Sequence, residues 1–224
     1  MLSLPASTEF NKRFPKQKLN ERLSFTPSLE KAFADQIKII YWRNKIAPTT
    51  LNLAQGENVT EIEVFEIKLK SKNLDENILR LMDKEIPYHF LFILEYENNY
   101  KVAISFKEPI PSGKPPFKVE RYYYTDWMSE ADLPLHLEGL NLDTVYENFV
   151  RQVAGKQLAD FGSYTLKASV EKQKDLEDLE RKISVLSLKL DREKQPKKRF
   201  ELHEELMNLN KQLDELKHEN GENI

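Results

Sequence analysis

Hydrophobic and polar residues follow two different patterns along the chain, and the change lies near Leu166. Before that point, short helical patterns alternate with runs rich in β-branched and aromatic residues, which are typical of strands. After it, leucine and isoleucine recur at steps of three and four residues with charged residues between them, which is typical of amphipathic helices. The pattern predicts a head domain at residues 1–158 and a helical segment at residues 166–220.

The clearest helical pattern in the head begins at Thr26. Thr26 is a preferred N-cap residue, and Pro27 is favoured at the first helical position. Hydrophobic residues then recur at helical spacing, at Leu29, Phe33, Ile37, Ile40 and Tyr41. Pro48 restricts the residue before it to extended geometry, so the pattern predicts a helix that ends near Ile46.

The remaining elements of the head complete an α+β pattern. Further helices are predicted at residues 16–23, at residues 73–86 with Asn73 or Asp75 as the N-cap, and at residues 143–155 with Gly155 as the C-cap. Strands are predicted at residues 60–70, in a hairpin over residues 87–107 that turns at Glu97-Asn98-Asn99, and at residues 117–127. This order indicates an α+β fold with a small mixed or antiparallel sheet that is flanked by helices, which we expect on one face.

Two leucine-rich stripes mark the C-terminal segment. The first contains Leu176, Leu179, Ile183, Leu186 and Leu190, and the second contains Leu202, Leu206, Leu209, Leu213 and Leu216. Pro196 lies between the stripes and cannot continue a helix interior. The pattern favours two helices that fold back on each other as an antiparallel coiled-coil hairpin, and one long kinked helix is the alternative.

Composition narrows the classes of function. Charged residues make up 32% of the chain but the net charge is only -3, so no general electrostatic attraction to nucleic acid or acidic membranes is expected. The chain has no cysteine, which excludes disulfides and cysteine-ligated zinc and fits a cytoplasmic location. The first residues lack a signal-peptide pattern, and no apolar run reaches the roughly 18 residues of a membrane span, so no membrane contact is predicted.

Six motifs follow one another along nearly the whole chain. They are TEFNKRFPKQK, DQIKIIYWRNKIAPTTLNL, VTEIEVFEIKLK, DKEIPYHFLFILEY, LEGLNLDTVYENFVRQVAG and the charged C-terminal hairpin. In this order they resemble a bacterial family known as domain of unknown function 4391. The resemblance implies a companion of helicases and DNA methyltransferases in restriction or phage-defence loci. The family has no established catalytic residues, so the resemblance transfers none to this chain.

A first candidate site follows the predicted helix end. Its residues are Trp42, Arg43, Lys45, Thr49, Thr50 and Asn52. Cations, hydroxyl and amide groups and an aromatic ring together are typical of contacts to nucleic-acid phosphates and bases. The structural alternative is that the two cations only complement the negative end of the helix dipole.

A second candidate site would be catalytic. Glu66 and Lys68 share one face of a predicted strand, and metal-dependent nucleases use an acid and a lysine with this spacing. Such a site needs a second acid, for which Glu61 and Glu63 are the candidates. The structural alternative is a solvated strand face.

Other residues with catalytic or ligating chemistry form no motif. The histidines are isolated, and His89 is interpreted as a core residue, so no metal site and no cofactor are predicted. The basic residues Lys194, Lys197, Lys198 and Arg199 are the one local positive cluster, and a solvated turn is their alternative explanation. The sequence thus favours a non-catalytic interaction subunit that contacts a helicase or methyltransferase, nucleic acid or a second copy of itself through the hairpin, and a nuclease is the alternative.

Overall fold

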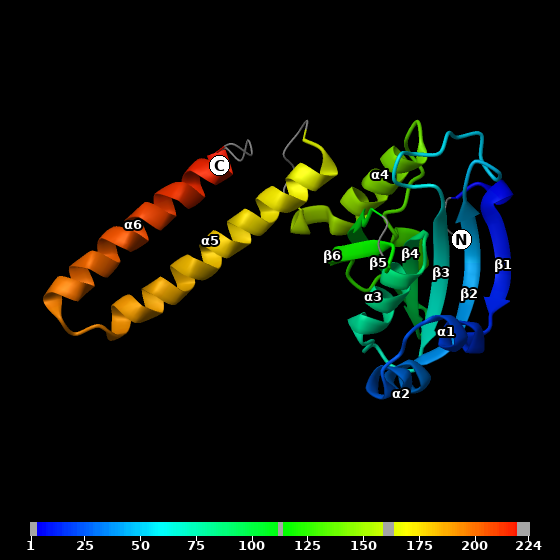
Figure 1. Ribbon diagram of the computed structural model, residues 1–224, viewed down its shortest axis with the longest axis horizontal. Coiled ribbons are helices and arrows are strands. Elements are labelled where there is room, and N and C mark those ends of the chain that lie inside the picture. The colour runs from blue at the N-terminus through cyan, green and yellow to red at the C-terminus, as the bar shows by residue number, and fades with distance from the viewer. Residues whose placement is uncertain (1–3, 112–113, 159–163, 219–224) are drawn as a thin grey trace. The chain divides into compact units, whose positions relative to one another are not determined.

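The computed structural model describes residues 4–111, 114–158 and 164–218, which form helices and one mixed sheet (Figure 1). In chain order the elements are η1 (Ala6–Thr8), β1 (Glu9–Phe14), α1 (Lys16–Arg22), α2 (Pro27–Gln36), β2 (Ile37–Ile46), β3 (Ile62–Leu69), α3 (Glu76–Glu85), β4 (His89–Tyr96), β5 (Asn99–Pro109), β6 (Phe117–Tyr124), η2 (Glu130–Asp132), α4 (Leu142–Ala154), η3 (Gly155–Gln157), α5 (Leu166–Arg192) and α6 (Pro196–His218). They divide into two compact units, Met1–Gly155 and Lys156–Ile224. The α+β fold class predicted from the sequence is confirmed.

The six strands lie in sequence order, β1 to β6, in one sheet. Neighbouring strands are antiparallel except β3 and β4, which are parallel and are connected through α3. The two-residue turn between β4 and β5 has positive φ at Glu97 (49°) and Asn98 (60°), as a tight hairpin requires. The sheet is therefore mixed, and its parallel pair lies in the middle.

Helices cover both faces of the sheet, so the expectation of helices on one face only was wrong. On the side to which Phe65 and Ile67 point, here called the α3 face, the core contains side chains of α1, α2 and α3. The opposite side is here called the Glu66 face, because strand side chains alternate between faces. There α4 packs through Tyr146, whose ring centroid lies 4.5 Å from that of the buried His89. The burial of His89 confirms its interpretation as a core residue, and burial, followed by the charge of Lys107, lowers its pKa.

The predicted helix from Thr26 to Ile46 was wrong beyond its first part. It begins as predicted, with the Thr26 side chain accepting from the N–H of Leu29, but it ends at Gln36 and the chain continues as β2. Two register irregularities interrupt β2, so its buried positions include Ile37, Ile40 and Asn44, at spacings of three and four. A bulged strand thus imitates the helical pattern. The cations of this stretch consequently lie on a strand and not at a helix end.

The edge strand β1 had no sequence prediction. Its six residues, EFNKRF, are mostly exposed, and its pairing with β2 is irregular where Asn11 has φ 44°. A short, charged and bulged strand of this kind protects the edge of a sheet from pairing with another chain, but gives little hydrophobic alternation to recognise.

The loop before β3 is tied to the first turn of α4. Oxygen atoms of the Asp143 carboxylate accept from the N–H groups of Glu57 (2.8 Å), Asn58 (3.2 Å) and Val59 (2.7 Å). A side chain on Gly56 would place its Cβ 2.0 Å from an oxygen of the same carboxylate. Glycine is therefore required here because the backbone approaches Asp143 closely.

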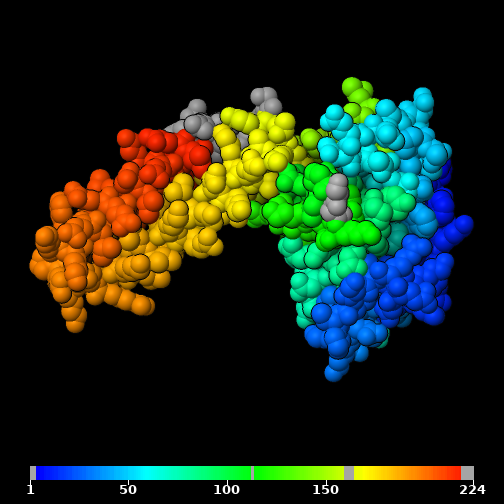
Figure 2. Space-filling view, viewed as in Figure 1, coloured from blue at the N-terminus to red at the C-terminus, as the bar shows by residue number. Residues whose placement is uncertain are grey.

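The second unit is a helical hairpin. Helix α5 ends at Arg192, and Pro196 begins α6, so the two-helix prediction is confirmed and a single kinked helix is not formed. The helices contact each other, with Leu186 buried, and their surfaces meet in Figure 2. Lys217 Nζ lies 3.2 Å from a carboxylate oxygen of Glu180. No helix within the described ranges is long and apolar enough to cross a membrane.

Candidate functional site

A continuous polar network crosses the Glu66 face from β1 to β4. We call it the polar ladder, and its members are Glu9, Asn11, Arg43, Glu66, Lys68 and Glu95. At its centre, Nε and one terminal nitrogen of Arg43 each lie 2.6 Å from the same carboxylate oxygen of Glu66. Lys68 Nζ lies between the carboxylates of Glu66, at 3.6 Å, and Glu95, at 3.3 Å. Acidic and basic groups thus alternate across the central strands.

The register of the strands explains this arrangement. Tyr41 pairs with Glu66 across the β2–β3 boundary, and Arg43, two residues further along β2, points to the same face and reaches the same carboxylate. Lys68 pairs with Glu95 because β3 and β4 are parallel and in register. At the β1 end, Arg43 donates to Asn11 Oδ1 at 3.3 Å, and the Asn11 amide donates to a Glu9 oxygen at 3.1 Å. The ladder therefore depends on pairing between distant parts of the sequence.

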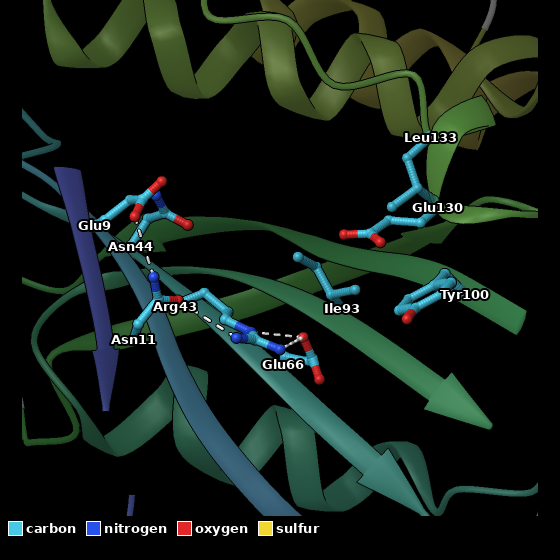
Figure 3. A pocket seen from close by; sticks show the side chains of 9 residues that line it. All are labelled: Glu9, Asn11, Arg43, Asn44, Glu66, Ile93, Tyr100, Glu130 and Leu133. Carbon is cyan, nitrogen blue, oxygen red and sulfur yellow. Dashed lines mark hydrogen bonds and ion pairs between the residues drawn. The ribbon is translucent and has the colours of Figure 1, made fainter. Parts of the chain in front are cut away.

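A cleft of about 270 Å³ opens beside the ladder (Figure 3). Its lining residues are Glu9, Asn11, Arg43, Asn44, Glu66, Ile93, Tyr100, Glu130 and Leu133. Figure 3 shows Arg43 and Glu66 on one side of Ile93, with Glu130 and Leu133 on the other. The segment that begins at η2 therefore forms the wall opposite β1 and β2.

The charges of the ladder and cleft affect one another. The hydrogen bond to Glu66 raises the pKa of Arg43, although burial opposes this shift. Burial lowers the pKa of Lys68, but the charges of Glu95 and Glu66 outweigh it and the net shift is upward. Burial, followed by the charges of Glu130, Glu66 and Glu95, raises the pKa of Tyr100. The charge of Glu66 contributes to all three shifts, so these groups are electrostatically coupled through this carboxylate.

The structure does not gather the six residues of the predicted binding site. The Trp42 ring stacks on Phe10 at 4.3 Å between ring centroids and contributes to the α3 face, whereas Arg43 belongs to the ladder on the other face. Lys45 Nζ lies 2.6 Å from a carboxylate oxygen of Glu61.

The residues of the predicted binding site that follow β2 are Thr49, Thr50 and Asn52, and the contacts of Thr50 are structural. The Thr50 hydroxyl donates to the carbonyl of Lys45 at 2.7 Å and accepts from the N–H of Ala47 at 3.1 Å, which closes the turn after β2. Thr49 and Asn52 are exposed on the same loop. Of the six residues, only Arg43 lines the cleft.

The acids proposed to complete a nuclease site also lie elsewhere. Glu63 points to the α3 face, because it is separated from Glu66 by an odd number of positions along β3, and Glu61 precedes the strand. The acid that does share Lys68 with Glu66 is Glu95, which sequence reasoning missed. In the described part of the chain, no three histidine, aspartate or glutamate side chains come together to hold a metal ion. Glu95 could have been found only from the parallel register of β3 and β4. No short-range sequence pattern specifies this register.

Comparison with known proteins gives one match. A family described as "Domain of unknown function (DUF4391)" matches residues 2–213. No curated protein and no solved structure matches the chain.

Proposed function

The chain belongs to the DUF4391 family, whose description names no activity, and we propose from its contacts that it is a non-catalytic interaction subunit. In this proposal it serves a bacterial, cytoplasmic DNA-targeting defence or restriction-modification system. The hairpin α5–α6 mediates assembly, and the head contacts nucleic acid or the partner enzyme, a helicase or a DNA methyltransferase.

The observation that carries this proposal is the apolar surface of the hairpin. Val185, Leu188, Phe200 and Met207 are 48%, 55%, 62% and 63% exposed. Successive helix residues are rotated by about 100°, so Val185 and Leu188 point away from the seam that buries Leu186. Two of these side chains lie on α5 and two on α6, and exposed apolar groups are used by many proteins to bind partners. The hairpin therefore has hydrophobic groups that its own pairing leaves accessible for assembly.

The introduction of charges at exposed apolar positions of the hairpin tests the assembly role. We expect the double variant Leu188→Lys with Met207→Lys to lose association with its partner at least roughly tenfold, because two desolvated apolar contacts are replaced by charges. The measurement is affinity capture from the native host followed by mass spectrometry. Ser184→Lys with Asn208→Lys adds the same charge at exposed polar positions of the same helices and is the control. Equal capture by both variants contradicts the assembly role.

Nucleic-acid contact by this chain has two candidate locations in the proposal. One is the basic tip of the hairpin, which begins at Lys194 and continues through Arg199. The other is the β2 end of the head with Arg43, Lys45, Thr49, Thr50 and Asn52. The tip is the better candidate, because the side chains of Arg43 and Lys45 are already bonded to Glu66 and Glu61. Replacement of the tip cations should reduce both DNA affinity and its salt dependence.

A metal-dependent nuclease is the second candidate, and the shared lysine favours it. Magnesium in proteins is commonly held by one or two carboxylates with water and substrate phosphate as further ligands, so Glu66 and Glu95 fit such an ion. When bound, the ion would activate water for phosphodiester hydrolysis. Lys68 would move from between the two carboxylates and stabilise the attacking oxygen, and Arg43 would keep Glu66 oriented.

Activity assays separate the two candidates. If the chain is a nuclease, purified protein should cleave single- or double-stranded DNA in magnesium or manganese. Glu66→Gln, Glu95→Gln and Lys68→Met should each lower the rate at least roughly 100-fold, because each removes a group that acts in the transition state. Lys18→Met, an exposed lysine on α1, is the control and should retain full activity. Cleavage that persists in all three variants would identify a contaminant.

A further inference from the structure

We propose that the cleft beside the polar ladder binds an organic cation: a guanidinium or ammonium group on a short apolar stem. An arginine or lysine side chain of a partner protein, or a free polyamine, has this chemistry. The inference concerns the first unit alone and does not depend on the assembly role of the hairpin.

The charges that line the cleft favour a cation. Three carboxylates, those of Glu9, Glu66 and Glu130, and one guanidinium, that of Arg43, line the cleft, and Lys68 lies next to Glu66 outside the lining. Arg43 hydrogen-bonds to one oxygen of Glu66, and the other oxygen lies 3.6 Å from Lys68, beyond hydrogen-bond distance. A carboxylate can accept several hydrogen bonds, so Glu66 retains acceptor capacity toward the cleft.

The apolar part of the lining fits a stem. Ile93 lies on β4 between the charged walls, and the Leu133 side chain stands opposite the ladder (Figure 3). Tyr100 adds an aromatic ring, which attracts cations that lie over its face. A cationic head between the carboxylates, with its methylene groups on Ile93 and Leu133, would contact both parts of the lining.

The electrostatic potential and the volume agree with this ligand class. Burial first, and the charges of Glu130, Glu66 and Glu95 next, raise the pKa of Tyr100, which agrees with the excess of carboxylates over cations in the lining. These carboxylates would repel a phosphate group. At about 270 Å³ the cleft is smaller than most drug-sized pockets, so it would hold one side chain or a short amine.

Binding of n-propylguanidinium to the isotope-labelled full-length chain tests the inference. Chemical-shift titration by NMR should give a dissociation constant in the millimolar range, as expected for a ligand of few atoms, with the largest shifts at Ile93, Tyr100 and Glu130. The neutral analogue n-propylurea and inorganic phosphate should each bind at least roughly tenfold more weakly, because charge is the main source of affinity.

Variants distinguish binding in the cleft from general electrostatic attraction of the cation to the protein surface. Glu130→Gln and Glu9→Gln should each weaken n-propylguanidinium binding roughly fivefold, whereas Glu120→Gln on β6, outside the cleft, should not change it. Equal binding of n-propylurea, or unchanged affinity in Glu130→Gln, would overturn the inference. A comparison of capped arginine amide with spermidine distinguishes the two sources of the cation. If capped arginine amide binds more tightly, the ligand is a side chain of a partner protein. If spermidine binds more tightly, the ligand is a free polyamine.

Discussion

Replacement of Lys107 with alanine is expected to lower the free energy of unfolding by about 3–5 kcal/mol, because it leaves a buried carboxylate without its counter-charge. The side chains of Lys107 and Asp83 are both fully buried. Lys107 Nζ donates to Asp83 Oδ1 at 2.9 Å, to the Asp83 carbonyl at 3.0 Å and to the Tyr88 carbonyl at 2.6 Å, which uses all three of its protons. The Tyr122 hydroxyl donates to the other Asp83 oxygen. This cluster connects α3 with β5 and β6.

Urea denaturation of the full chain, followed by circular dichroism, measures the effect. Lys118→Ala removes an exposed lysine whose Nζ lies 2.5 Å from a Glu120 oxygen, and this control should cost at most about 1 kcal/mol. The double variant Lys107→Met with Asp83→Leu should recover a large part of the loss, since no unpaired charge remains. A Lys107→Ala cost as small as that of Lys118→Ala would show that water or neighbouring groups compensate Asp83.

Two lysines of the sheet, Lys107 on β5 and Lys68 on β3, show how burial determines the role of a charge. Burial lowers the pKa of Lys107, and the charge of Asp83 only partly opposes it, so this ion pair is costly unless every hydrogen bond is made. Lys68 is one-third exposed, and the net shift of its pKa is upward. Its carboxylate partners can therefore exchange it for water or a ligand at a smaller cost. For this reason the nuclease and cation-binding proposals concern the Glu66 face, whereas the stability prediction for Lys107 concerns the α3 face.

Elements with local signals could be predicted from the sequence. Gly155, which has positive φ, ends α4, the Asn98 turn connects β4 and β5, and Pro196 begins α6. In each case a few neighbouring residues contain the necessary information. The prediction of β2 was wrong for the opposite reason. Its irregular pairing with β1 and β3 places buried residues at helical spacing, and this pairing is not visible in the local sequence.

The candidate site could be predicted only in part. Glu66 and Lys68 share a face because of alternation along one strand, and this was visible in the sequence. Arg43 and Glu95 join them through the pairing of β3 with its two neighbours, and Glu130 reaches the cleft from a segment after β6. Such contacts depend on register and strand order, which local residue patterns do not specify.

Glu63 gives the second large prediction, a pH-dependent stability. It is 4% exposed on the α3 face, and one carboxylate oxygen has no hydrogen-bond partner among the described residues. Burial, followed by the neighbouring Glu61, raises its pKa to about 8, although Lys45 opposes the shift. Between pH values of about 4.5 and 8, the folded protein therefore retains a proton that the unfolded chain has lost, and unfolding becomes more favourable as the pH rises.

The variant Glu63→Gln isolates this effect, because glutamine resembles the protonated acid and does not titrate. Its stability relative to the unmodified protein should increase from pH 4.5 to about 8 and then level off. The total gain should be about 3–5 kcal/mol, since one pKa unit corresponds to about 1.4 kcal/mol. The buried His89, whose pKa is lowered, has the opposite pH dependence below its ordinary value, but it is present in both proteins and cancels in the difference.

Urea denaturation at half-unit steps from pH 5 to pH 9 measures the difference between the two proteins. Glu61→Gln provides a second comparison, because it removes the charge that raises the pKa of Glu63 and leaves Lys45, whose charge lowers it. The unfolding free energy of Glu61→Gln should therefore depend less on pH than that of the unmodified protein. Parallel stability curves for the unmodified protein and Glu63→Gln would instead show that Glu63 is ionised in the fold at neutral pH. Its unpartnered oxygen would then have to be bonded to water or a cation.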